Sequence, residues 1–313
     1  MRLRRLALCS LLITAPVFAQ SDDVFQRVRR ALSGSGQGDL AAAELAKNHF
    51  GKVEEMLAAV RASSPAGRAE LLSLQGAVAF LAGEMKSSVA YFDNAAALAP
   101  LADADRFTCA MALVKLGDDQ RARAVLSDLA RTHPERSLYV YWLGRLDYDQ
   151  RRYQEAVDHL QRAAQLDPKS ARIWDALGLA FDMQGRIEPA LQAFQTAVDL
   201  NRALPHPSAW PPHNLGFLLL RMDRLKDAEA ALRESLRYDS HLAQSHYHLA
   251  RALEKQDRDA EAIEEYRSAA SEDPASADAC YSLALLYRKL HREADAGAMF
   301  AEYRKRKQAA AVQ

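Results

Sequence analysis

Histidine and cysteine are the residues of this chain best suited to binding a metal ion. The chain has nine histidines, and His241, His246 and His248 lie close together in the sequence. On a helix, His246 and His248 would point about 200° apart, so they cannot ligate one ion together. No cysteine pair has zinc-binding spacing, and neither an HExxH nor a CxxCH motif occurs. The sequence therefore predicts no metal site and no cofactor.

Motifs for catalysis are missing as well. The chain contains no glycine-rich phosphate loop, no nucleophile elbow and no paired-carboxylate framework. Its Asp and Glu residues are scattered over the polar faces of segments with helical periodicity. We predict that the protein is not an enzyme. The alternative is a small-ligand-binding or enzymatic protein built within the helical segments, which would need a closed, buried polar pocket.

A period of 34 residues organises the segments that carry these side chains. Between residues 137 and 200, Gly144 and Gly178 are one period apart, and so are Leu160 and Phe194. A fixed period of this length is typical of stacked repeats. Apolar residues within each unit follow helical spacing, with a break in the middle, so each unit is predicted to hold two helices.

The same register extends over residues 69–310. Small residues occupy the eighth and twentieth places of each unit, where helices must approach closely, and large apolar residues occupy the twenty-fourth place. One interval is longer, because a Pro-rich insertion at 205–208 precedes the fifth unit. The predicted units are 69–102, 103–136, 137–170, 171–204, 209–242, 243–276 and 277–310.

The motif residues of the third unit resemble those of the tetratricopeptide repeat (TPR) family, at Leu143-Gly144, Ala156, Leu160, Ala163 and Pro168. The resemblance implies an all-α fold, a right-handed α-solenoid (superhelix) of stacked helix-turn-helix units. Residues 20–68 are then N-terminal helices and a degenerate first repeat, because terminal repeats cap such a stack.

The N-terminal residues 1–19 form a different kind of segment. Arg2, Arg4 and Arg5 precede an apolar run that ends in a small-x-small pattern at Ala19. This pattern indicates a secretory signal peptide, so we expect an exported protein of bacterial type, periplasmic or secreted. An uncleaved anchor is the alternative, although the run is short for a membrane span. After cleavage we expect no membrane span.

Net charge and cysteine usage limit the partners and the chemistry further. The whole chain has a formal net charge of zero, which argues against a nucleic-acid partner. After signal cleavage only Cys109 and Cys280 remain, in repeats five units apart. Stacked repeats touch only their neighbours, so we predict two unpaired, buried thiols.

The resemblance implies a scaffold that binds a peptide or protein in a concave groove and supports assembly of an envelope complex. In the family this face is lined by the first helix of each unit. Carried onto this sequence, those places hold aromatic residues and arginines, which suit an extended peptide with some acidic character. Alternatively, several aromatics pack between neighbouring first helices, or the protein only self-associates. The predicted binding residues are Tyr141, Arg145, Tyr148, Arg172, Trp210, His213, Phe217, Arg221, Tyr247, Arg251, Tyr281 and Arg288.

Overall fold

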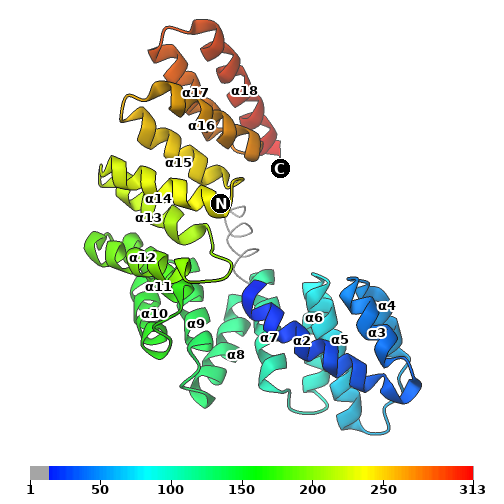
Figure 1. The fold of residues 1–313 in the computed structure, drawn as a ribbon. Helices are drawn as coiled ribbons and strands as arrows, with labels where there is room; N and C mark the ends of the chain where they lie inside the picture. Colours follow the sequence, from blue (N-terminus) through cyan, green and yellow to red (C-terminus); the bar gives the residue numbers. More distant parts are fainter. Residues whose placement is uncertain (1–13, 313) are drawn as a thin grey trace. The chain divides into compact units, whose positions relative to one another are not determined.

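A computed structural model describes residues 14–312. All regular secondary structure among these residues is helical. The predicted all-α fold is confirmed (Figure 1). The chain forms two compact units that divide within one helix, between Leu146 and Asp147.

Over its described residues, the first unit consists of the helix α2 followed by helical pairs. Its helices are α2 (Thr14–Ala31), the 3-10 helix η1 (Ser33–Ser35), α3 (Gly38–Ala46), α4 (Phe50–Ala58), α5 (Pro65–Leu81), α6 (Met85–Ala96), α7 (Asp103–Leu116), α8 (Asp119–Thr132) and the first part of α9 (Ser137–Asp149). Ser64 accepts a hydrogen bond from the Gly67 amide and Pro65 follows it, so α5 begins four residues before the repeat register does.

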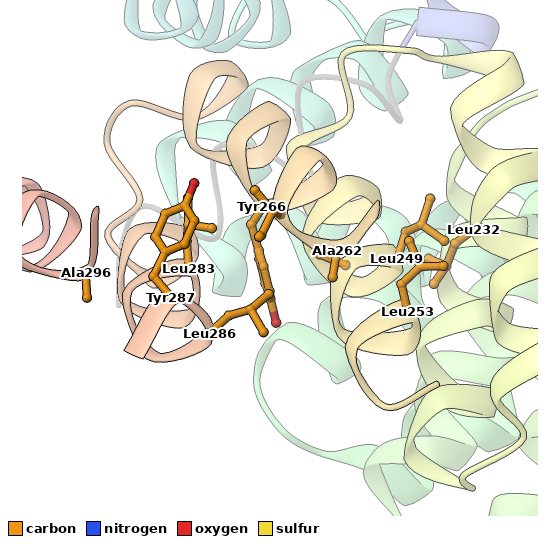
Figure 2. Close-up of a cluster of buried hydrophobic side chains, with 11 residues drawn as sticks. Leu232, Leu249, Leu253, Ala262, Tyr266, Leu283, Leu286, Tyr287 and Ala296 are labelled. Carbon is orange, nitrogen blue, oxygen red and sulfur yellow. The ribbon is translucent and has the colours of Figure 1, made fainter. Parts of the chain in front are cut away.

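The second unit continues in the same way from the end of α9. Its helices are α10 (Tyr153–Leu166), α11 (Ala171–Met183), α12 (Ile187–Arg202), α13 (Trp210–Arg221), α14 (Leu225–Tyr238), α15 (Ala243–Glu254), α16 (Asp259–Glu272), α17 (Asp278–Lys289) and α18 (Glu293–Val312). Each of α10 to α17 contacts the helix that follows it. Figure 2 shows one resulting core cluster, in which Leu249, Leu253 and Tyr266 lie between neighbouring pairs.

Close approach within the pairs depends on the small residue at the eighth place. A Cβ atom at Gly178 would lie 2.6 Å from two ring carbons of Phe194, and one at Gly216 would lie 2.6 Å from Cγ of Leu232. Phe194 and Leu232 are themselves buried. The large twenty-fourth residue therefore fills the space that the missing side chain leaves, as the sequence pattern predicts.

The turn inside the pair has the same conformation in each of the seven units of the repeat register. Residues at the fifteenth place of the repeat register have positive φ, whether the residue is Gly185 (φ 73°) or Arg151 (φ 61°). The next residue donates its amide hydrogen to a carbonyl five positions earlier, for example Arg186 to Phe181. This arrangement is a Schellman motif, which ends the first helix and starts the second within a few residues.

The N-terminal helix α2 packs on α3 and α5. Val24, Val28 and Leu32 are buried, and Arg27 makes a two-pronged ion pair with the buried Asp105 of α7 at 2.8 and 2.9 Å. The predicted signal peptide lies mostly outside the described residues, since residues 1–13 are not described. Within residues 14–312, no helix combines the length and the apolar character needed to cross a membrane.

Candidate binding surface

His246 and His248 lie on the same helix, α15, but their side chains have different neighbours. His246 contacts Glu265 at 2.6 Å and the Ser240 carbonyl at 3.0 Å. Burial alone would lower the pKa of His246, but these two hydrogen bonds raise it above its usual value. His248, two residues later, packs among aromatic rings instead. Over the described part of the chain, no group of three or more His, Cys, Asp or Glu side chains is placed to hold a metal ion.

Both thiols outside the N-terminal segment are free and buried, so that prediction is confirmed. Burial raises the pKa of Cys109 to about 11 and also raises the pKa of Cys280. Neither thiol is thus activated as a nucleophile.

The first helices of successive pairs in the second unit are linked by side-chain contacts. Asn214 of α13 donates a hydrogen bond to Asp175 of α11 at 2.9 Å, and Arg221 of α13 pairs with Asp182 of α11 at 2.7 Å. We call the side of α11, α13, α15 and α17 that carries these contacts the first-helix surface.

Aromatic rings continue this surface from α13 to α15. Phe217 lies 4.5 Å from His248, measured between ring centroids, and Tyr247 lies 5.3 Å from His248. His213 lies 5.4 Å from His248 and 5.5 Å from Trp210. Rings from two neighbouring helices thus form one continuous run of contacts.

His213 anchors this run in the core. Its Nδ1 atom lies 2.9 Å from the Ser245 hydroxyl, which lies 2.7 Å from the Ser235 hydroxyl. The Ser235 hydroxyl in turn donates to the Ala209 carbonyl at 2.8 Å. Burial lowers the pKa of His213 to about 4, so the ring is neutral at ordinary pH and serves as a packed hydrogen-bonding group.

The predicted binding residues differ in their accessibility. Tyr141, Arg145 and His213 are buried, with exposed fractions of 1%, 6% and 6%. Arg221, Tyr281 and Arg288 are exposed, although the Arg221 guanidinium is held by Asp182. The remaining six are half-buried: Tyr148, Arg172, Trp210, Phe217, Tyr247 and Arg251.

Ring contacts show that several predicted aromatics also pack between elements. Tyr148 lies edge-on to Tyr153 at 5.7 Å, and Tyr281 lies 6.1 Å from Phe300 and 5.1 Å from Tyr303 of α18. The Arg288 guanidinium lies 5.9 Å from the Phe300 ring. These contacts join the two helices of one pair, whereas the contact of Phe217 with His248 joins neighbouring first helices, as the alternative supposes.

The Pro-rich insertion is tied to the helices on both sides. Asn201 of α12 is buried and donates to the Ser208 carbonyl, while the Ser208 amide donates back to Asn201, both at 2.8 Å. Pro211 and Pro212 occupy the first turn of α13, where a missing amide hydrogen costs nothing. The insertion therefore holds the start of α13, with Trp210, in a defined position.

A shallow pocket of about 240 Å³ lies between α12, α13 and α14. Arg202 and Glu234 at its edge form a two-pronged pair at 2.7 and 2.6 Å, and Arg224 pairs with Asp227 at 2.7 Å. The hydrogen bond from Arg202 lowers the pKa of Glu234, which keeps this carboxylate ionised. The charges at this pocket thus pair with one another.

Sequence reasoning considered His248 only as a metal ligand and missed its place in the aromatic run. The sequence did hold a signal for this contact. His248 lies one period of 34 residues after Asn214, which contacts Asp175 of the preceding first helix, α11.

Comparisons with known proteins identify the repeats. A family model described as tetratricopeptide repeat matches residues 108–171, 143–206 and 214–277, which together exceed half of the chain. Among curated proteins, the general transcriptional corepressor ssn6 of Schizosaccharomyces pombe is 27% identical over 41% of this chain and 11% of its own length. The BBSome complex member BBS4 homolog of Drosophila melanogaster is 26% identical over 52% of this chain and 35% of its own length. The chain thus spans about a third or less of these relatives.

Solved structures share the fold at low sequence identity. The Cut9-Hcn1 hetero-tetramer of the APC/C matches with a TM-score of 0.64 and 18% identity, covering 77% of this chain and 46% of that chain. PilW, a type IV pilus biogenesis factor, matches with a TM-score of 0.58 and 19% identity over 64% and 91%. Pseudomonas aeruginosa pilF matches with a TM-score of 0.58 and 18% identity over 66% and 97%. The fold and the repeat matches confirm the resemblance seen in the sequence, and the chain belongs to the tetratricopeptide repeat family.

Proposed function

We propose that this protein is a non-catalytic scaffold that holds an extended segment of a protein partner along its first-helix surface. The observation that carries the proposal is the run of half-buried rings on α13 and α15, where Trp210, Phe217 and Tyr247 keep part of their surface open. Half-buried aromatic residues supply large contact areas at low entropic cost, as binding surfaces require.

The cations of this surface support a partner with acidic character. Arg251 lies 5.9 Å from the centroid of the Tyr247 ring, and the described residues give it no ion pair. The exposed Arg288 likewise lies over a ring and is without an ion pair there. A partner carboxylate would complete such sites and would add orientation as well as affinity.

The proposal includes export and a role in assembling an envelope complex. Residues 1–19 support export, since their pattern is that of a secretory signal peptide. Support for assembly comes from the names of proteins with the same fold, which include a type IV pilus biogenesis factor and a subunit of the APC/C. N-terminal sequencing of the exported product should find Gln20 at its start, and an intact Met1 on a cytoplasmic protein would refute export.

The binding test uses the accessible residues of the surface. Tyr141 and Arg145 are unsuitable because both are buried, so their replacement would damage the core. A triple variant, Trp210→Ala with Phe217→Ala and Arg251→Ala, should lose the partner that the wild-type chain captures from its own envelope fraction. Its helicity by circular dichroism should stay unchanged.

A matched control carries three substitutions at exposed positions outside this surface, Lys226→Ala, Arg237→Ala and Arg304→Ala. This control should capture the partner as the wild type does. If the triple variant also captured it at wild-type affinity, the partner would bind elsewhere and the proposed surface would be wrong.

A further inference from the structure

Among the charged side chains of α13 and α15, one makes neither an ion pair nor a hydrogen bond with a side chain of the described residues. On α13, Arg221 pairs with Asp182. On α15, Glu254 accepts a hydrogen bond from Tyr266 at 2.8 Å and His246 contacts Glu265. Within the described residues, only Arg251 among the charged side chains of these two helices contacts neither a carboxylate nor a hydroxyl.

Helix geometry places Arg251 on the open side of α15. Leu249 and Leu253 point into the core cluster (Figure 2), and both are fully buried. At 100° per residue, Tyr247 and Arg251 lie one turn apart on the other side of the helix. The half-buried Tyr247 also packs against this cluster, with its ring centroid 5.8 Å from that of Tyr266, so only part of the Tyr247 ring is open. The guanidinium over the Tyr247 ring is thus held in place by a neutral contact, and its hydrogen-bond donors remain available.

His248 lies beside this arginine and has an unusual hydrogen-bonding state. Its Nδ1 atom is buried and has no partner in the described structure, whereas no such burial applies to Nε2. A neutral imidazole carries one hydrogen, and an unpaired acceptor in the core costs less than an unpaired donor would. The tautomer with its hydrogen on Nε2 is therefore favoured, and the donor N–H is the one left toward the surface.

Neutrality of this ring follows from its surroundings. Its neighbours are the rings of Phe217, His213 and Tyr247, and the nearby charged group is Arg251. Burial, followed by the neighbouring His213 and Arg251, lowers the pKa of His248 to about 3. The ring thus acts as an apolar wall with a single hydrogen-bond donor over the whole physiological pH range.

We propose that Phe217, Tyr247, His248 and Arg251 form a subsite for an acidic residue that adjoins an apolar side chain in an extended partner segment. The apolar side chain packs on the rings of Phe217 and Tyr247. The carboxylate accepts hydrogen bonds from the Arg251 guanidinium and from Nε2–H of His248. This assignment rests on the proposed function and names the chemistry that the surface selects.

The carboxylate belongs to an Asp or Glu side chain rather than to a chain end. The first-helix surface does not stop at Arg251, because the Tyr247 hydroxyl lies 3.4 Å from the Ser282 hydroxyl of α17. A segment that follows this surface continues past the subsite, so an internal residue supplies the charge.

The test uses the full chain labelled with ¹³C and ¹⁵N at histidine and arginine, titrated with acetylated peptides, of which all but one are amidated. Three peptides of the form Ser-Gly-Phe-X-Gly-Ser carry Glu, Gln or Lys at X, and a fourth ends in a free carboxylate after Phe. The Glu peptide should shift the signals of His248 and Arg251 and bind about tenfold more tightly than the Gln peptide. Its affinity should stay constant from pH 8 to pH 5.5, because the ring and the carboxylate keep their charge states.

Variants of the chain test which side chains bind the carboxylate of the peptide. Arg251→Glu should reverse the preference, so that the Lys peptide binds best, while Arg237→Glu on α14 should change nothing. His248→Phe keeps the ring but removes the N–H donor, so it should weaken the Glu peptide several-fold without weakening the Gln peptide.

Several results would overturn the subsite. These are equal affinities for Glu, Gln and Lys peptides, absence of shifts at His248 and Arg251, or binding only by the peptide with the free carboxylate. Failure here is distinguishable from failure of the proposed function, since capture of the native partner would still depend on Trp210, which lies outside the subsite.

Discussion

Replacing Gly178 by alanine tests the packing rule that holds each helical pair together. The new Cβ atom would lie 2.6 Å from Cδ1 and Cε1 of Phe194 and 3.0 Å from its Cγ. Phe194 is 1% exposed, so its ring has little room to move away. Overpacking of this kind costs about 1–3 kcal/mol. Alanine is also a better helix former than glycine by about 1 kcal/mol, so the expected net loss is about 1 kcal/mol.

A second substitution makes this expectation specific. The chain itself combines Ala110 with Leu126 at the corresponding places of another pair. Phe194→Leu should therefore destabilise the wild type but relieve the clash in the Gly178→Ala background. The coupling energy between the two changes should reach about 1 kcal/mol or more. Gly76→Ala is the comparison, because its Cβ would meet the buried Phe92 ring at 3.1 Å rather than 2.6 Å and should cost less than Gly178→Ala does.

Urea unfolding followed by circular dichroism measures these differences. Repeat proteins depart from two-state unfolding, so the midpoints and slopes should be compared across all four members of the cycle. A loss of 1 kcal/mol corresponds to about 2–4 °C in the melting temperature of a unit of this size. If Gly178→Ala were as stable as the wild type and additive with Phe194→Leu, close packing at this place would not limit stability.

Three further perturbations address the loop, the turn and the buried histidine. Asn201→Ala should lower the free energy of unfolding by about 1–3 kcal/mol, because both Ser208 backbone groups lose their hydrogen-bond partner. Limited proteolysis should then cut at 203–209, and an unchanged digestion pattern would contradict this. Arg151→Gly should raise the free energy of unfolding by about 0.5–1 kcal/mol, because its φ of 61° strains a side-chain-bearing residue; a lower urea midpoint would refute this. His213 has a pKa of about 4 in the folded chain, so below pH 6.5 it binds a proton in the unfolded chain but not in the folded one. The free energy of unfolding should therefore fall toward pH 4 by on the order of 3 kcal/mol. His213→Gln should make this decline in the urea midpoint smaller, and an equal decline in the variant would contradict the reasoning.

The amino-acid sequence by itself determined the helical pairs and the way each pair closes. The small eighth and large twenty-fourth residues recur at a fixed distance along the chain, as Gly178 and Phe194 do. Helical periodicity and this spacing are local properties, so they can be read without coordinates. Burial of both thiols follows from the same periodicity.

Tertiary structure alone decided which of the predicted binding side chains stay accessible. Arg221 and Asp182 are 39 residues apart, and so are Asn214 and Asp175, because the insertion lengthens that one interval. His213 meets Ser245 across 32 residues and is buried, although the resemblance placed it among the residues expected to line the groove. These contacts depend on the distances between side chains of neighbouring helices and on the charge state that burial imposes. The 34-residue period of the sequence specifies neither the distances nor the charge state.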